Sequence, residues 1–137
     1  MLHFPTDVTP PPRVLVLSHD PELRRELSIT LRLWRLDPVV CRDPSELSLE
    51  ASRGCPLAVV LDATMPGTDV VGLARSLREF PTTRGVVCVG VLDHLGEDAI
   101  ELATKAGCDR VTARPVDPDW VGAEIERVAA RRGVRAA

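Results

Sequence analysis

The chain has 137 residues, a formal net charge of −3 and a hydrophobic content of 45%. A chain of this length fits one domain with a full core. No apolar run reaches the roughly 18 residues of a membrane span, the start lacks the pattern of a secretory signal, and the charge does not favour nucleic-acid binding. We therefore expect a cytoplasmic protein that contacts neither membrane nor nucleic acid.

Strand and helix signals alternate along the chain. Residues 1–12 include three consecutive prolines, which favour an extended, flexible arm. We expect strands at 14–17, 39–41, 57–61, 86–91 and 111–113, and helices that start at Pro21 and Asp43 and span 69–80, 97–106 and 118–132. Asp37-Pro38 is expected to end the first helix, and residues 133–137 to form a disordered tail.

The third strand, 57–61, is apolar at every position, as expected of a parallel sheet that is covered on both faces. Five strand–helix units in a row predict an α/β domain over 13–132 with a doubly wound, five-stranded parallel sheet and five helices. Function in such sheets gathers beyond the carboxyl ends of the strands. The candidate groups at those ends are Ser18, His19, Asp20, Asp62, residues 90–93 and Arg114.

The four cysteines, Cys41, Cys55, Cys88 and Cys108, include no pair at CxxC spacing. Neither a zinc site nor a dithiol redox site is therefore predicted. Cys41 and Cys88 lie inside apolar runs and are expected to be small core residues in a reduced compartment.

Three motifs, in order, resemble those of the receiver domain of bacterial two-component response regulators. They are LSHDPELRREL at 17–27, LDATMPGTD at 61–69 and KAGCDRVTARPV at 105–116. The resemblance covers roughly Arg13 to Arg132 and implies the flavodoxin-like receiver fold with strand order 2-1-3-4-5. It places Asp62 at the position that accepts a phosphoryl group from a histidine kinase with the help of Mg²⁺.

The acidic pocket departs from the family pattern. Ser18 and His19 stand where the family has two adjacent acids, and Asp20 follows them. The metal ligands that remain are Asp62, Asp20 and the carbonyl of Thr64. Mg²⁺ prefers oxygen ligands in near-octahedral geometry, so we expect Mg²⁺ binding to be weak or absent, with no other cofactor.

The rest of the family's machinery is also altered. Gly90 falls at the position of the family's hydroxyl, with Leu92 as the alternative alignment, and Val111 replaces the switch aromatic. Arg114 replaces the family's lysine; it could clamp a phosphoryl group or pair permanently with Asp62, and the pairing is favoured. Pro115 follows it, and a cis Arg114–Pro115 peptide bond is expected.

These features favour a single-domain receiver with an atypical pocket, a pseudo-receiver that acts by protein–protein interaction. It is not an enzyme and is at most a phosphoryl acceptor. The alternative is an active receiver whose Asp62 takes phosphate from a histidine kinase. Expected partners are a histidine kinase or a downstream signalling protein. A second copy could bind through the fourth helix, fifth strand and fifth helix, about 97–132, where Trp120 is expected to pack in the core.

Overall fold

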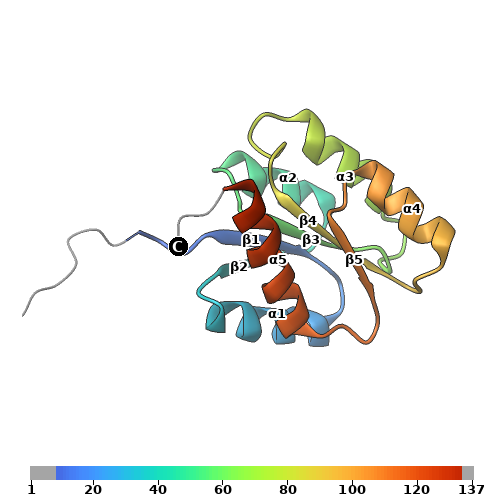
Figure 1. The fold of residues 1–137 in the computed structure, drawn as a ribbon, viewed down its shortest axis with the longest axis horizontal. Coiled ribbons are helices and arrows are strands. Elements are labelled where there is room, and N and C mark those ends of the chain that lie inside the picture. The colour runs from blue at the N-terminus through green and yellow to red at the C-terminus, as the bar shows by residue number, and fades with distance from the viewer. Residues whose placement is uncertain (1–8, 134–137) are drawn as a thin grey trace, which may run out of the picture.

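The computed structural model describes residues 9–133 of the chain (Figure 1). The expectation of a flexible arm falls largely on residues 1–8, and that of a tail on 134–137; both stretches lie outside the described residues. The first element begins at Arg13 and the last ends at Arg132.

Strands and helices alternate throughout residues 9–133. The strands are β1 (Arg13–Leu17), β2 (Asp37–Cys41), β3 (Ala58–Asp62), β4 (Val87–Leu92) and β5 (Arg110–Ala113). The helices are α1 (Pro21–Leu33), α2 (Pro44–Ser52), α3 (Val70–Glu79), α4 (Glu97–Ala106) and α5 (Pro118–Arg132). The predicted spans of α4 and α5 agree with these bounds, and the other elements differ by a few residues at their ends.

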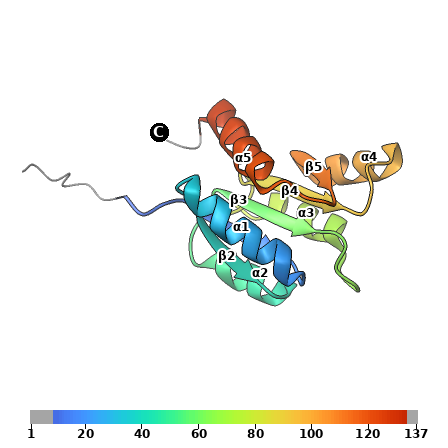
Figure 2. The same cartoon turned by 90° about the horizontal axis from the view of Figure 1, so that it is seen from below.

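The five strands form one parallel sheet in the order β2-β1-β3-β4-β5, which confirms the predicted fold class and strand order. Figure 2 shows β2 and β5 at the two ends of this order, with β3 between them. Every residue of β3 and β4 is buried, which explains their continuous apolar sequence.

The prediction that Pro38 ends the first helix is wrong. Helix α1 ends earlier, at Leu33, and Arg35 has a positive φ of 60°. The N–H of Leu36 donates to the carbonyl of Leu31, 3.0 Å away, and the N–H of Arg35 to that of Arg32, at 2.9 Å. This is a Schellman cap. Pro38 instead lies inside β2, an edge strand, where a missing N–H is tolerated.

Helices cover both faces of the sheet (Figure 1). Helices α1 and α5 pack with one core cluster, and α2, α3 and α4 pack with the other. Cys41 and Cys88 are fully buried, as predicted. Trp120 is half-buried and packs against the α1 and α5 cluster, at the edge of the core rather than within it.

Parallel pairing brings the carboxyl ends of the central strands to one edge of the sheet. Leu17 pairs with Leu61, and Asp62 pairs with Val91. The segments that follow β1, β3 and β5 therefore meet there, and they carry the candidate side chains. No helix within residues 9–133 is long and apolar enough to cross a membrane.

Candidate functional site

Asp62 is the last residue of β3, and only 1% of its surface is exposed. Its Oδ1 accepts hydrogen bonds from the backbone N–H of Thr64 at 2.9 Å and from the Thr64 hydroxyl at 2.6 Å. Its Oδ2 accepts from the Ser18 hydroxyl at 2.7 Å and from Nη2 of Arg114 at 2.9 Å. Both carboxylate oxygens are thus occupied by groups of the protein itself.

Arg114 connects the two carboxylates of the pocket. Its Nη2 contacts Asp62, as above, and also donates to the Thr64 hydroxyl at 3.1 Å, while Nη1 donates to Oδ2 of Asp20 at 2.5 Å. Desolvation acts to lower the pKa of Arg114, but the hydrogen bond to Asp20 and the charge of Asp62 raise it overall. Arg114 thus contacts both Asp20 and Asp62, and the peptide bond from Arg114 to Pro115 is cis.

Asp20 serves two partners at once. As the N-cap of α1, it accepts with Oδ1 from the N–H groups of Glu22 at 3.0 Å and Leu23 at 3.4 Å. Its other oxygen is held by Arg114, and this hydrogen bond is the main reason why the pKa of Asp20 lies below its ordinary value. Both oxygens of Asp20 are thus engaged by groups of the protein itself.

Ser18 and His19 turn in opposite directions from the end of β1. Ser18 is fully buried; its hydroxyl donates to Asp62 and accepts from the N–H of Asp20 at 3.1 Å. His19 is exposed, and its Nε2 lies 2.7 Å from the carbonyl oxygen of Arg42, just after β2. Of the two positions where the family has acids, only Ser18 contacts Asp62.

Gly90 lies in the middle of β4, opposite Leu61 and Val111 in the sheet. A Cβ at this position would meet Sγ of Cys108 at 3.2 Å and Cγ1 of Val111 at 3.6 Å. The space that a hydroxyl-bearing side chain would need is therefore filled by these two neighbours. Leu92, the alternative position, is buried at the end of β4 and likewise has no hydroxyl.

The sequence reasoning missed the role of the Thr64 side chain, whose hydroxyl contacts both Asp62 and Arg114. The carbonyl of Thr64 was expected to matter, but the contacts to Asp62 and Arg114 come from its hydroxyl and its N–H. The signal was present in the sequence, since an aspartate often binds the backbone N–H two residues later.

A magnesium ion does not fit this set of side chains as they stand. The two carboxylates, Asp62 and Asp20, already share Arg114 as their cation. Within residues 9–133, no group of three or more His, Cys, Asp or Glu side chains is placed to hold a metal ion. Mg²⁺ would compete with the guanidinium for the same carboxylate oxygens.

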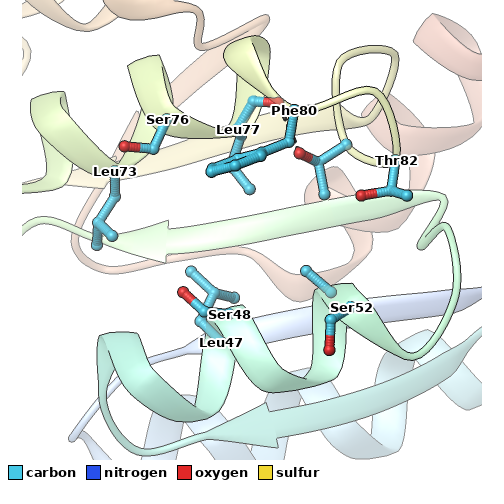
Figure 3. A pocket seen from close by; sticks show the side chains of 10 residues that line it. Leu47, Ser48, Ser52, Leu73, Ser76, Leu77, Phe80 and Thr82 are labelled. Atoms are coloured by element: carbon cyan, nitrogen blue, oxygen red, sulfur yellow. Dashed lines mark hydrogen bonds between the residues drawn. The ribbon is translucent and has the colours of Figure 1, made fainter.

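A hollow of about 220 Å³ lies between α2 and α3, away from this pocket. Figure 3 shows Leu47 on one side and Leu73, Leu77 and Phe80 on the other, with hydroxyl groups such as Ser48 among them. None of the candidate site residues lines it. The hollow is thus separate from the chemistry around Asp62.

Comparison with known proteins gives a consistent result. No family model matches the chain. The transcriptional regulatory protein PrrA of Mycobacterium tuberculosis is 29% identical over 122 residues, which cover 89% of this chain and 52% of PrrA. The chain thus spans about half the length of the curated relatives it matches.

Two solved structures show the same fold. A putative response regulator from Chloroflexus aurantiacus superposes with a TM-score of 0.80 at 21% identity, over 88% of this chain and 99% of the other. The receiver domain of the sensor histidine kinase PA1611 from Pseudomonas aeruginosa gives a TM-score of 0.76 at 18% identity, over 88% and 98%. That receiver domain holds a magnesium ion in its active-site cleft.

Proposed function

We propose that this chain is a receiver whose pocket carboxylates are neutralised by its own Arg114. Its fold is that of response-regulator receiver domains, and its curated relatives are response regulators. In this proposal it signals by binding a protein partner, without regulated, metal-dependent phosphorylation of Asp62. The observation that carries the proposal is the contact of Arg114 with both pocket carboxylates.

Electrostatic attraction stabilises the state in which Arg114 holds Asp62. Opposite unit charges about 4 Å apart attract by roughly 4 kcal/mol at an effective dielectric of 20. Arg114 makes such a contact with buried Asp62, at 2.9 Å between Nη2 and Oδ2. Phosphoryl transfer to an aspartate needs a cation that is free to bridge the carboxylate and the incoming phosphoryl oxygens. Here the available cation is tied to the acceptor before any substrate arrives.

The path from the pocket to the surface also supports the proposal. In the family, a hydroxyl after the fourth strand and an aromatic on the fifth strand respond to the phosphoryl group. Here neither Gly90 nor Leu92, the two candidates for the hydroxyl position, carries a hydroxyl, and Val111 stands at the position of the aromatic. A phosphoryl group on Asp62 would find no hydroxyl at either candidate position to attract.

A partner-binding role needs a surface, and the face formed by α4, β5 and α5 is our candidate. Leu95, in the loop before α4, is 52% exposed, and Leu102, within α4, is 55% exposed. The partner in this proposal is a histidine kinase, a downstream signalling protein of the cytoplasm, or a second copy of the chain.

The alternative function is an active phosphoacceptor, and one observation favours it. Asp62 keeps its position at the end of a buried central strand, and a neighbour of the same fold binds magnesium in its cleft. Under this alternative, Arg114 would leave Asp62 and clamp the phosphoryl oxygens.

Intact-protein mass after incubation with acetyl phosphate or phosphoramidate and Mg²⁺ distinguishes the two. Our proposal expects no phosphoryl adduct on the folded chain; the receiver domain of PA1611, which holds magnesium in its cleft, is treated in parallel as the control for the reagent. An adduct that is absent in Asp62→Asn would overturn the proposal and establish the active alternative. Pull-down partners that bind the wild type and Asp62→Asn equally would support the phosphorylation-independent role.

A further inference from the structure

Two cysteines that are twenty positions apart in the sequence meet inside the protein. The Sγ atoms of Cys88 and Cys108 lie 3.7 Å apart, with Cys88 donating its S–H to Cys108. Cys88 belongs to β4 and Cys108 to the connection between α4 and β5. The spacing in the sequence gave no sign of this pair, because parallel pairing of β4 and β5 creates it.

The backbone around the pair is held in place. The N–H of Asp109 donates to the carbonyl of Cys88 at 2.8 Å, and the N–H of Cys88 donates to Oδ2 of Asp109, also at 2.8 Å. Arg78 fixes Asp109 in turn through an ion pair at 2.9 Å. The two sulfurs must approach by less than 2 Å to reach the bond length of a disulfide, about 2.05 Å.

The two thiols are not equivalent. Cys108 lines a surface hollow together with Arg78, Gly107 and Asp109, whereas Cys88 lies deeper, at 1% exposure. The hydrogen bond from Cys88 lowers the pKa of Cys108, against desolvation and the charge of Asp109, which raise it, and the same hydrogen bond raises the pKa of Cys88. Because Cys108 also lies at the hollow and is 5% exposed, we assign it as the attacking sulfur.

We propose that Cys88 and Cys108 form a two-electron oxidation site, which a hydroperoxide converts to a disulfide between β4 and the start of β5. This inference does not depend on the state of Asp62. Disulfides of this kind in a reducing compartment are usually transient and act in redox sensing.

The chemistry needs only one peroxide molecule. The thiolate of Cys108 attacks a peroxide oxygen, the O–O bond breaks, and Cys108 becomes a sulfenic acid as one water is formed. The sulfur of Cys88 then displaces the hydroxyl group, which leaves as a second water with the thiol proton. Two thiols lose two electrons and two protons in total, and hydrogen peroxide is reduced to two waters.

The disulfide would enclose the segment from Cys88 to Cys108, which contains all of α4. Because α4 is part of the candidate partner-binding face, oxidation would restrict the movement of that helix relative to β4. Amide exchange in α4 should then slow on oxidation and recover on reduction.

Tryptic mapping of the full chain tests the site directly. Cys41, Cys55, Cys88 and Cys108 fall in four different tryptic peptides, 36–42, 54–75, 85–105 and 106–110. After hydrogen peroxide treatment of the folded chain, alkylation and digestion, we expect peptide 85–105 to be joined to 106–110. The free thiol count in denaturant should fall from four to two, and dithiothreitol should restore it.

Matched variants make the result specific. Cys55→Ser removes the exposed thiol and should leave the link intact, as should Cys41→Ser. Cys88→Ser and Cys108→Ser should each abolish the link. Peptides 85–105 and 106–110 that stay unlinked, with both of their thiols free, after a treatment that oxidises the exposed Cys55, or links that join Cys55 to other peptides, would overturn the proposal. The map of the unaltered chain decides this even if a variant fails to fold.

Discussion

Replacing Asp62 by asparagine should destabilise this domain, and the sign of that change tests the description of the pocket. In a pocket crowded with acids, removing one carboxylate relieves repulsion and stabilises the fold. Here Asp62 faces the Arg114 guanidinium at 2.9 Å and three neutral donor groups. Asparagine keeps the shape but loses the charge, so Arg114 would lose its buried partner.

The size of the effect follows from the contacts that are lost. A hydrogen bond to a charged group contributes about 1.5–3 kcal/mol. The side chain of Arg114 is 34% exposed, so solvent screening reduces its share and places the expected loss near the lower end, at about 2 kcal/mol. With a urea m-value of about 1–3 kcal/mol/M, the unfolding midpoint should fall by roughly 1 M.

A double-mutant cycle assigns this loss to the ion pair. Asp62→Asn, Arg114→Met and the double variant are unfolded in urea at pH 7, with the fluorescence of Trp34 and Trp120 as the signal. Because the two side chains are in contact, their effects should not add. The double variant should be less destabilised than the sum of the single variants, with a coupling free energy of about 1–2 kcal/mol.

Two results would refute the reasoning. A midpoint for Asp62→Asn that is unchanged or higher would mean that repulsion, not the pair with Arg114, dominates the pocket. A coupling free energy below about 0.5 kcal/mol, the usual error of additivity, would mean that the contact contributes nothing measurable. Ser52→Ala, an exposed position on α2 away from Asp62, removes only the hydrogen bond from its hydroxyl to the carbonyl of Leu49 and serves as the control for a local change elsewhere.

Two further predictions follow. The pKa of Asp20 is lowered in the folded state, so its carboxylate contributes stability above its ordinary pKa of 3.8. This contribution is lost as the pH falls through the lower, folded value. Asp20→Asn should therefore weaken the dependence of the urea midpoint on pH below about pH 4, and an unaltered dependence would contradict the pairing of Asp20 with Arg114. Gly90→Thr should destabilise the domain by about 1–3 kcal/mol, because the Cβ of the threonine would lie 3.2 Å from Sγ of Cys108. Adding Cys108→Ala to this variant should recover most of the lost free energy of unfolding, as measured in urea. No recovery would mean that the strain arises from another contact.

Most of the fold could be predicted from the sequence because local signals and long-range pairing agree. The apolar runs at β3 and β4 leave little choice but a buried parallel sheet. The end of α1 was misjudged because a Schellman cap with arginine in the left-handed position replaces the glycine that usually marks it. Proline is a strong helix-ending residue, so Pro38 predicts the end of a helix that in fact ends at Leu33.

The candidate site was only partly predictable, for a different reason. Asp62, Asp20 and Arg114 follow strands or open a helix, so the topology brings them to one edge. Whether a guanidinium pairs with one carboxylate or with two depends on rotamers that the sequence does not specify. The same limit hid the contact of Cys88 with Cys108, because motif spacing detects sites within one segment and not across two strands.

The substitutions around Asp62 make most sense as a set. A carboxylate at position 18 would place an acceptor about where the Ser18 hydroxyl now lies, 2.7 Å from Oδ2 of Asp62. Two carboxylate oxygens at that distance repel unless a cation or a shared proton lies between them, so an acid there favours a bound metal ion. Serine supplies a donor instead and removes that repulsion. Arg114 then contacts both remaining carboxylates, Asp20 through Nη1 and Asp62 through Nη2. Lysine has one ammonium group and could not place a separate nitrogen on each carboxylate. Each change lowers the pocket's need for Mg²⁺, and together they leave Asp62 with a complete set of partners drawn from its own chain.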